Sequence, residues 1–178
     1  LNYRIEYNGG KEDEFIETSE NKFGGMEILD FKVSNNTDLT QSVIESYKFK
    51  KDNEVEVIGD RMYFSPLFFL RTKENPFKLE KREFPVDFGY ASENKFRIGI
   101  IVPEGYVIET LPESALLMLP DELGSFAYNI TALSDRIQLI VSIKIEQPII
   151  SPLYYETLRE YFKLMIGKMD EKVVLTKI

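Results

Sequence analysis

The sequence predicts a mainly β protein: an antiparallel β-sandwich with an accessory N-terminal helix and a C-terminal helix packed on the sheet. Apolar and polar residues alternate along several short segments, which is typical of strands with one buried face. No helical segments separate these strands, and this argues against the parallel sheet of nucleotide-binding folds. A change to a helical period near residue 151 predicts the C-terminal helix.

The N-terminal part of the chain predicts one helix among short strands. Residues 1–7 form a candidate strand, and the acidic segment 11–23 suits a helix that ends at Gly24 and Gly25. The apolar period then changes to two, which predicts further strands at 29–33, 43–49, 54–58 and 61–64.

The second half of the chain has the more regular pattern. Residues 65–85 contain several Pro and Asn residues and predict an irregular connection. Strands are expected at 96–102, 106–110, 126–130 and 137–145, and the last two predict a hairpin with its turn at Ser134 and Asp135.

A helix is predicted to follow this hairpin. Ser151 is a candidate N-cap, and Pro152 suits the first helical position because that position needs no backbone N–H. Residues at helical spacing form one apolar stripe: Leu158, Tyr161, Phe162, Met165 and Ile166. A final strand at 172–175 is expected to rejoin the sheet.

Composition excludes several classes of function. The 178 residues include 22 Lys and Arg and 30 Asp and Glu, so the net charge is −8, which argues against binding to nucleic acid or anionic lipid. The chain contains no Cys and no His, so it has no thiol nucleophile, no thiolate metal site and no imidazole general base. Carboxylate pairs or a Ser–Lys dyad remain chemically open, and a stand-alone hydrolase is the least favoured hypothesis.

The length suits one domain or two small ones. Because the chain begins with Leu1 rather than Met, we expect it to be part of a longer protein. Residues 1–24 are interpreted as a helical lead-in from a preceding domain, and residues 25–178 as the β-sandwich module, with 25–75 and 76–178 as candidate subdivisions. The sequence has no apolar run of about 18 residues, so no membrane span is expected.

The chain offers few candidate ligand sites. Acidic residues cluster at 12–14 and 121–122, but they lack the spacing of a calcium loop and are interpreted as solvated surface. The glycine pairs are interpreted as turns, because no Gly-Lys-Ser/Thr follows them. No cofactor and no metal are therefore expected, and no catalytic residue is assigned.

The densest segment, residues 75–90, combines charges, aromatic residues and two prolines without periodicity. Arg82, Asp87 and Tyr90 are the candidate partner-contact or structural residues within it. One interpretation makes these three residues a recognition patch. The favoured interpretation is an anchored crossover in which Arg82 pairs with a carboxylate such as that of Asp87.

Aromatic residues suggest an alternative function. The chain has 10 Tyr and 13 Phe, and those at 63–69 and 84–90 could line a groove for a carbohydrate or a peptide. Packing in a β-rich core is the favoured interpretation, because aromatic side chains suit half-buried sheet surfaces. Burial of these rings would exclude the groove.

Four motifs in the second half of the chain follow the pattern of a known family. They are Asn-Pro-Phe at 75–77, Arg-Glu-Phe-Pro-Val-Asp-Phe-Gly-Tyr at 82–90, Ile-Val-Pro-Glu-Gly-Tyr at 101–106 and Glu-Thr-Leu-Pro at 109–112. With the C-terminal helix and residues 171–177, they resemble the C-terminal, non-catalytic region of large bacterial transglutaminase-like proteins. The resemblance extends, more loosely, back to Gly25. It implies an exported, periplasmic or envelope-associated parent, in which an N-terminal β-domain and a transglutaminase/protease-like Cys-His-Asp core precede a domain of unknown function.

The family's catalytic Cys and His have no counterpart here, so no catalytic role transfers to any position. The resemblance therefore implies a non-enzymatic accessory module that braces the catalytic domain of the same polypeptide or contacts an envelope partner. The alternative hypothesis is a carbohydrate- or peptide-binding β-sandwich domain.

Overall fold

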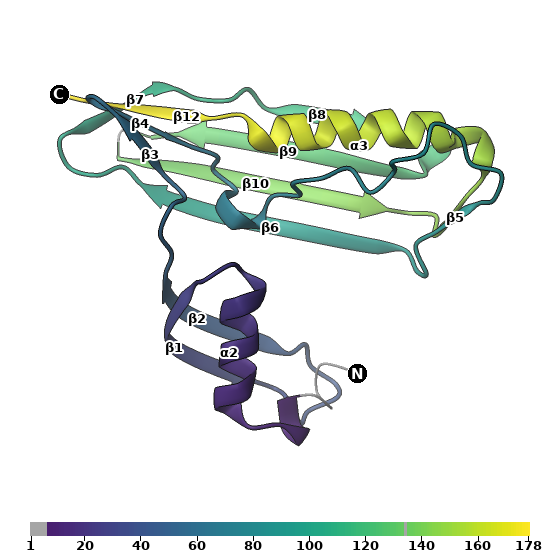
Figure 1. Ribbon diagram of the computed structural model, residues 1–178, viewed down its shortest axis with the longest axis horizontal. Helices are drawn as coiled ribbons and strands as arrows, with labels where there is room; N and C mark the ends of the chain where they lie inside the picture. Colours follow the sequence, from purple (N-terminus) through teal and green to yellow (C-terminus); the bar gives the residue numbers. More distant parts are fainter. Residues whose placement is uncertain (1–6, 134) are drawn as a thin grey trace. The chain divides into compact units, whose positions relative to one another are not determined.

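The structure is a computed structural model, which describes residues 7–133 and 135–178 (Figure 1). Its internal contacts divide the chain into two compact units, residues 1–54 and 55–178. The lead-in predicted for residues 1–24 and the subdivision predicted after residue 75 stay predictions.

The first unit consists of helix α2 (Glu12–Lys22) and an antiparallel hairpin of β1 (Glu27–Ser34) and β2 (Ile44–Lys50). The helix ends where Gly24 and Gly25 adopt left-handed φ angles of +71° and +77°, and the Gly25 N–H donates to the carbonyl oxygen of Glu20. The helix and the hairpin meet through aromatic rings: Phe31 lies 5.6 Å from Phe15 and 5.0 Å from Tyr47, between ring centroids. This unit is therefore held together by a small cluster of half-buried aromatic rings.

The second unit contains the main sheet, which is antiparallel and has the strand order β6-β10-β9-β8. Its strands are β6 (Ser92–Ile101), β8 (Ala115–Met118), β9 (Gly124–Ala132) and β10 (Arg136–Ile145). The sheet has one buried face, because Ile137, Leu139 and Val141 of β10 are buried while the residues between them are exposed.

A second four-stranded sheet has the order β3-β4-β12-β7, and its neighbouring strands are antiparallel. Its strands are β3 (Glu56–Ile58), β4 (Arg61–Phe64), β7 (Tyr106–Thr110) and β12 (Val173–Lys177). The last strand in the sequence, β12, thus occupies a central position between β4 and β7.

The C-terminal helix α3 (Tyr155–Asp170) packs against the main sheet beside β8 and leads into β12 (Figure 1). A short helical turn, η3 (Pro152–Tyr154), precedes the helix, and the Ser151 hydroxyl caps this turn by accepting a hydrogen bond from Leu153. Leu158, Tyr161, Met165 and Met169 form the buried stripe of α3. Buried residues of both sheets and of α3 form one hydrophobic core.

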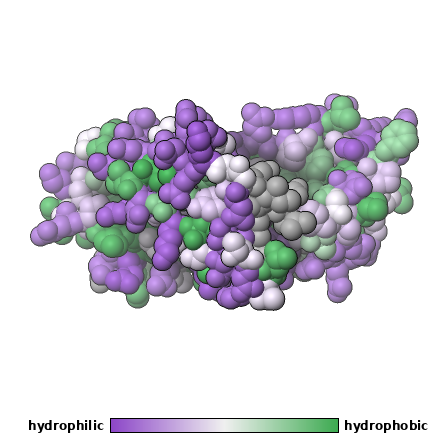
Figure 2. Space-filling model, turned by 90° about the horizontal axis from the view of Figure 1, so that it is seen from below, coloured by the Kyte–Doolittle hydropathy of each residue, from purple (hydrophilic) through white to green (hydrophobic). Residues whose placement is uncertain are grey.

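The remaining elements are short. The connection from β4 to β6 includes η1 (Phe68–Leu70) and β5 (Val86–Asp87), which pairs with β11 (Ile149–Ile150). A third helical turn, η2 (Pro120–Glu122), joins β8 to β9. On the face shown in Figure 2, hydrophobic side chains lie in separate patches among hydrophilic ones.

These elements confirm the predicted mainly β, antiparallel class with an N-terminal and a C-terminal helix. The hairpin of β9 and β10 is confirmed, whereas its predicted turn residue Ser134 lies outside the described residues. The strand expected at residues 1–7 also lies outside them, except for Tyr7, which is helical. Strand β8 was missed, because its sequence Ala-Leu-Leu-Met does not alternate.

Candidate functional site

The connection that contains the predicted site residues is anchored to α3 by Asn75 and Phe77. The Asn75 side chain donates to the backbone carbonyl oxygen of Arg159 at 2.8 Å and accepts from the Phe77 N–H at 2.9 Å. The buried Phe77 ring packs edge-to-face against Phe162 and Tyr155 of the helix, at centroid distances of 4.9 and 5.9 Å. The Asn-Pro-Phe motif therefore has a structural role.

Arg82, Asp87 and Tyr90 lie in the connection between β4 and β6. No ion pair joins Arg82 to Asp87 in the described part of the chain, so the specific pairing favoured from the sequence is absent. The Asp87 carboxylate instead accepts a hydrogen bond from the Gly89 N–H at 2.7 Å and stabilises the turn after β5. Tyr90 is 73% exposed.

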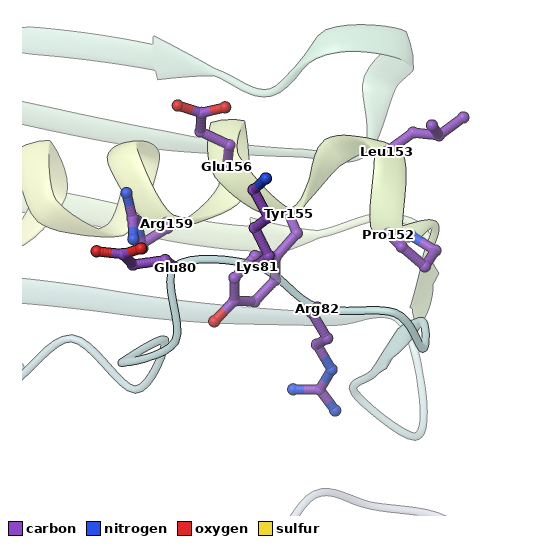
Figure 3. A pocket seen from close by; sticks show the side chains of 8 residues that line it. All are labelled: Glu80, Lys81, Arg82, Pro152, Leu153, Tyr155, Glu156 and Arg159. Atoms are coloured by element: carbon purple, nitrogen blue, oxygen red, sulfur yellow. The ribbon is translucent and has the colours of Figure 1, made fainter.

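Arg82 lines a shallow pocket of about 440 Å³ at the N-terminal end of α3. The other lining residues are Glu80, Lys81, Pro152, Leu153, Tyr155, Glu156 and Arg159. Figure 3 shows the Arg82 side chain extending away from α3, whereas the Glu156 side chain projects from the helix in the opposite direction. Arg159 donates to the carbonyl oxygen of Leu79 at 3.2 Å, so part of its hydrogen-bonding capacity holds the connection. Three cations and two carboxylates nearly balance here, and the pocket has no strong field of one sign.

A second hollow lies where the edge strand β8 meets α3, and we call it the edge groove. It has a volume of about 510 Å³. Strand β8 contributes Leu116, Leu117 and Met118, and α3 contributes Glu156, Thr157, Glu160, Tyr161 and Leu164. This groove combines an apolar floor with two carboxylates one helical turn apart.

Three apolar side chains of the edge groove are exposed. Leu116 and Met118 are 65% and 62% exposed, and Leu164 is 52% exposed. Tyr161 is buried, and its hydroxyl has no hydrogen-bond partner among the described residues. Burial raises the pKa of the Tyr161 hydroxyl above its ordinary value.

The two carboxylates of the edge groove differ in their surroundings. Glu160 forms an exposed ion pair with Lys163, at 3.1 Å between Oε1 and Nζ. Within residues 7–133 and 135–178, Glu156 has no ion-pair partner. Exposed pairs contribute little free energy, so the Glu160 carboxylate can exchange its partner.

The acidic clusters seen in the sequence show no metal-binding arrangement. Among residues 7–133 and 135–178, no three His, Cys, Asp or Glu side chains are grouped closely enough to hold an ion. Asp121 instead accepts a hydrogen bond from the Tyr154 hydroxyl, which joins η2 to the start of α3. No helix in this part of the chain is both long and apolar enough to cross a membrane.

Sequence reasoning missed the edge groove. Strand β8 has no alternation of apolar and polar residues. The sequence pattern of α3 predicted its buried stripe but did not single out the exposed residues beside it, which line the groove. No sequence signal distinguished it, because the uncharged run from Ala115 to Leu119 is shorter than the uncharged run from Leu123 to Ser134.

Comparison with known proteins identifies the family. One solved structure with a similar arrangement is that of a "putative protease" from Parabacteroides distasonis ATCC 8503, with a TM-score of 0.47 and 14% identity. The similarity covers 55% of this chain and 19% of that one, so the chain spans about a fifth of that protein's length. No curated protein matches. Residues 60–175, more than half of the chain, match DUF3858, a domain of unknown function with a solved structure, and the chain belongs to this family.

Proposed function

We propose that this chain is a non-catalytic accessory module of a transglutaminase/protease-like multidomain protein of the bacterial cell envelope. In this role it braces the catalytic domain or contacts an envelope partner. The motif resemblance supports the proposal, as does a composition without Cys or His. The observation that carries it is the edge groove, an exposed apolar surface suited to contact with another polypeptide.

The location of the motif residues also supports an accessory role. Phe77 and Val86, from the two most distinctive motifs, are buried, and Asn75 holds the connection to α3. These residues maintain the fold, which leaves the exposed surfaces for contact with a partner.

The experiment is to determine the mass and peptide coverage of the native polypeptide in its source cells, and then to delete this module from it. We expect a mass several times 20.7 kDa, upstream peptides that contain Cys and His, and a lower melting temperature of the remaining catalytic domain. A native species of 20.7 kDa would refute the proposal. An unchanged melting temperature together with unchanged envelope association would also count against it.

Peptide binding is the second candidate, and the same groove favours it. A carbohydrate-binding groove lined by aromatic residues has less support. Phe64 is buried, and its ring stacks on that of Phe68 with 5.5 Å between the ring centroids. Of the rings considered in the sequence, Phe84 and Tyr90 are the strongly exposed ones, at 75% and 73%.

A further inference from the structure

We propose that the edge groove binds an extended, basic polypeptide segment, which adds a strand to the main sheet next to β8. The inference rests on the proposed function, because it names the surface through which the accessory module contacts another polypeptide. Its occupant is defined by chemistry: a short strand with apolar side chains and at least one Lys or Arg.

The backbone of β8 is open on one side. In the described part of the chain β8 pairs with β9 alone. The Leu119 N–H donates to the carbonyl oxygen of Gly124 at 2.9 Å, and hydrogen-bonded positions recur at every second residue of an antiparallel pair. Leu117 and Ala115 therefore bond to β9, whereas the N–H and C=O groups of Leu116 and Met118 point toward the open edge.

The opposite edge of the same sheet differs in chemistry. Strand β6 carries Glu93, Lys95 and Arg97 at exposed positions, and charged side chains of this kind oppose pairing with another strand. Strand β8 carries no charge, and its exposed residues are Leu116 and Met118. Charge therefore protects the first half of β6, whose last residue Ile101 is uncharged and exposed, whereas β8 is uncharged over all four of its residues.

The side chains of α3 define the character of the added strand. The Tyr154–Asp121 hydrogen bond places the start of α3 by the end of β8, so the helix runs antiparallel to the strand (Figure 1). An added strand antiparallel to β8 therefore begins beside Glu156 and Glu160 and ends beside Leu164. The residues of the added strand that face α3 are therefore expected to be basic near its start and apolar at its end. The residues that alternate with them lie on the outer face of the sheet, where they contact Leu116 and Met118.

Charge also decides between a foreign segment and a second copy of this chain. Two β8 strands paired about a twofold axis would bring Glu156 and Glu160 of both copies to one interface. Each chain also carries a net charge of −8, so self-association is opposed by like-charge repulsion. A basic segment meets the same carboxylates with complementary charge.

The test is an NMR titration of the isotope-labelled 178-residue chain with the capped pentapeptide Lys-Val-Lys-Val-Leu. We expect amide shifts at Leu116 and Met118 that saturate with added peptide and weaken with salt. Two matched peptides serve as controls. Glu-Val-Glu-Val-Leu carries the opposite charge, and a backbone N-methylated Lys-Val-Lys-Val-Leu cannot donate the strand hydrogen bonds. Both should bind at least about tenfold more weakly.

Variants of the protein locate the contact. The double variant Glu156→Lys/Glu160→Lys should reverse the preference and bind the acidic peptide about tenfold better than the basic one. Leu116→Pro removes an N–H that faces the open edge without removing a bond to β9, so it should abolish binding and retain the fold. Glu104→Lys, in the turn between β6 and β7, places one such charge reversal outside the residues that line the groove and should leave binding unchanged.

Three results would overturn the inference: no shift at β8 with millimolar peptide, equal affinity for both peptide charges, or a concentration-dependent dimer that Leu116→Pro abolishes. If the peptides fail while the chain still binds its parent's catalytic domain, the groove assignment is wrong and the proposed function stands. If neither binds, both fail.

Discussion

The side-chain hydroxyl of Ser65 donates a hydrogen bond of 2.7 Å to the backbone carbonyl oxygen of Met169, 104 positions later in the chain. Ser65 follows β4, and Met169 lies in the last turn of α3. This bond joins the two segments just where β12 leaves the helix to pair with β4. It is buried, since Ser65 and Met169 are 1% and 0% exposed.

Ser65→Ala should lower the free energy of unfolding by about 1–3 kcal/mol, because it leaves a buried carbonyl oxygen without a donor. Chemical denaturation would measure this loss. The control is Ser142→Ala, whose hydroxyl donates to Glu93 at an exposed position and should matter much less. Equal effects of the two substitutions would contradict the assigned role of the Ser65 bond.

Val141→Asp should prevent folding, because it places an unpaired carboxylate on the buried face of β10. Its neighbour Ile140 is 43% exposed on the other face, so Ile140→Asp should leave the fold intact. Circular dichroism and melting curves of both variants provide the measurement. A folded Val141→Asp with an unchanged melting temperature would refute the orientation of this strand.

Gly124→Ala should destabilise the chain by about 1–3 kcal/mol through overpacking. A Cβ atom at this position would lie 2.5 Å from the backbone carbonyl oxygen of Lys144 and 3.3 Å from Leu119 Cδ1. Gly99→Ala, also in the main sheet, adds a methyl group with nothing within 4 Å and is the matched control. If Gly124→Ala melts no lower than Gly99→Ala, the close approach of β9 and β10 is wrong.

Tyr128→Phe should raise stability by roughly 1 kcal/mol, because the buried Tyr128 hydroxyl has no hydrogen-bond partner in the described residues. Burial, with a smaller contribution from Glu171, raises the pKa of Tyr128 above its ordinary value of 10.0. Above about pH 10 the unfolded chain therefore releases this proton more readily than the folded one, and stability falls as the pH rises.

The Phe variant should consequently lose less stability than the wild type between about pH 9 and 11, in denaturation series across that range. Tyr90→Phe removes an exposed hydroxyl and serves as the control. If the stability of the wild type and of Tyr128→Phe falls equally as the pH rises, the prediction is wrong and the Tyr128 hydroxyl is accessible to water.

Asn75→Ala should cost about 1–2 kcal/mol, because its side chain makes two hydrogen bonds that hold the connection to α3. Arg82→Ala should change stability by less than about 0.5 kcal/mol, since the Arg82 side chain extends away from α3. Melting temperatures of the two variants provide the comparison. A larger loss for Arg82→Ala would restore this residue as a structural anchor.

Much of the fold could be predicted from local patterns, because the strands of the main sheet bury one face and α3 buries one stripe. The alternation of Ile137, Leu139 and Val141 reports directly on that burial. Strand β8 could not be found in this way. Its side chains Leu116 and Met118 remain exposed although they are apolar, so its pattern carries no contrast between the two faces.

The candidate site depended even more on tertiary structure. Asp87 was expected to pair with Arg82, yet its carboxylate accepts a hydrogen bond from the Gly89 N–H within a local turn. Such local hydrogen bonds compete well with distant partners, because the two groups are already close along the chain. The edge groove joins residues about 40 positions apart. Neither segment alone indicates that the other lies beside it.

The central place of β12 in the second sheet has a consequence for biosynthesis. Strands β3, β4 and β7 leave the ribosome long before residues 173–177, and β4 and β7 have no direct pairing with each other. Until β12 emerges, the nascent chain therefore carries the β3–β4 pair with one edge open and the strand β7 without a partner in this sheet. A chain that lacks β12 would leave the facing edges of β4 and β7 unpaired, and we expect it to be prone to aggregation.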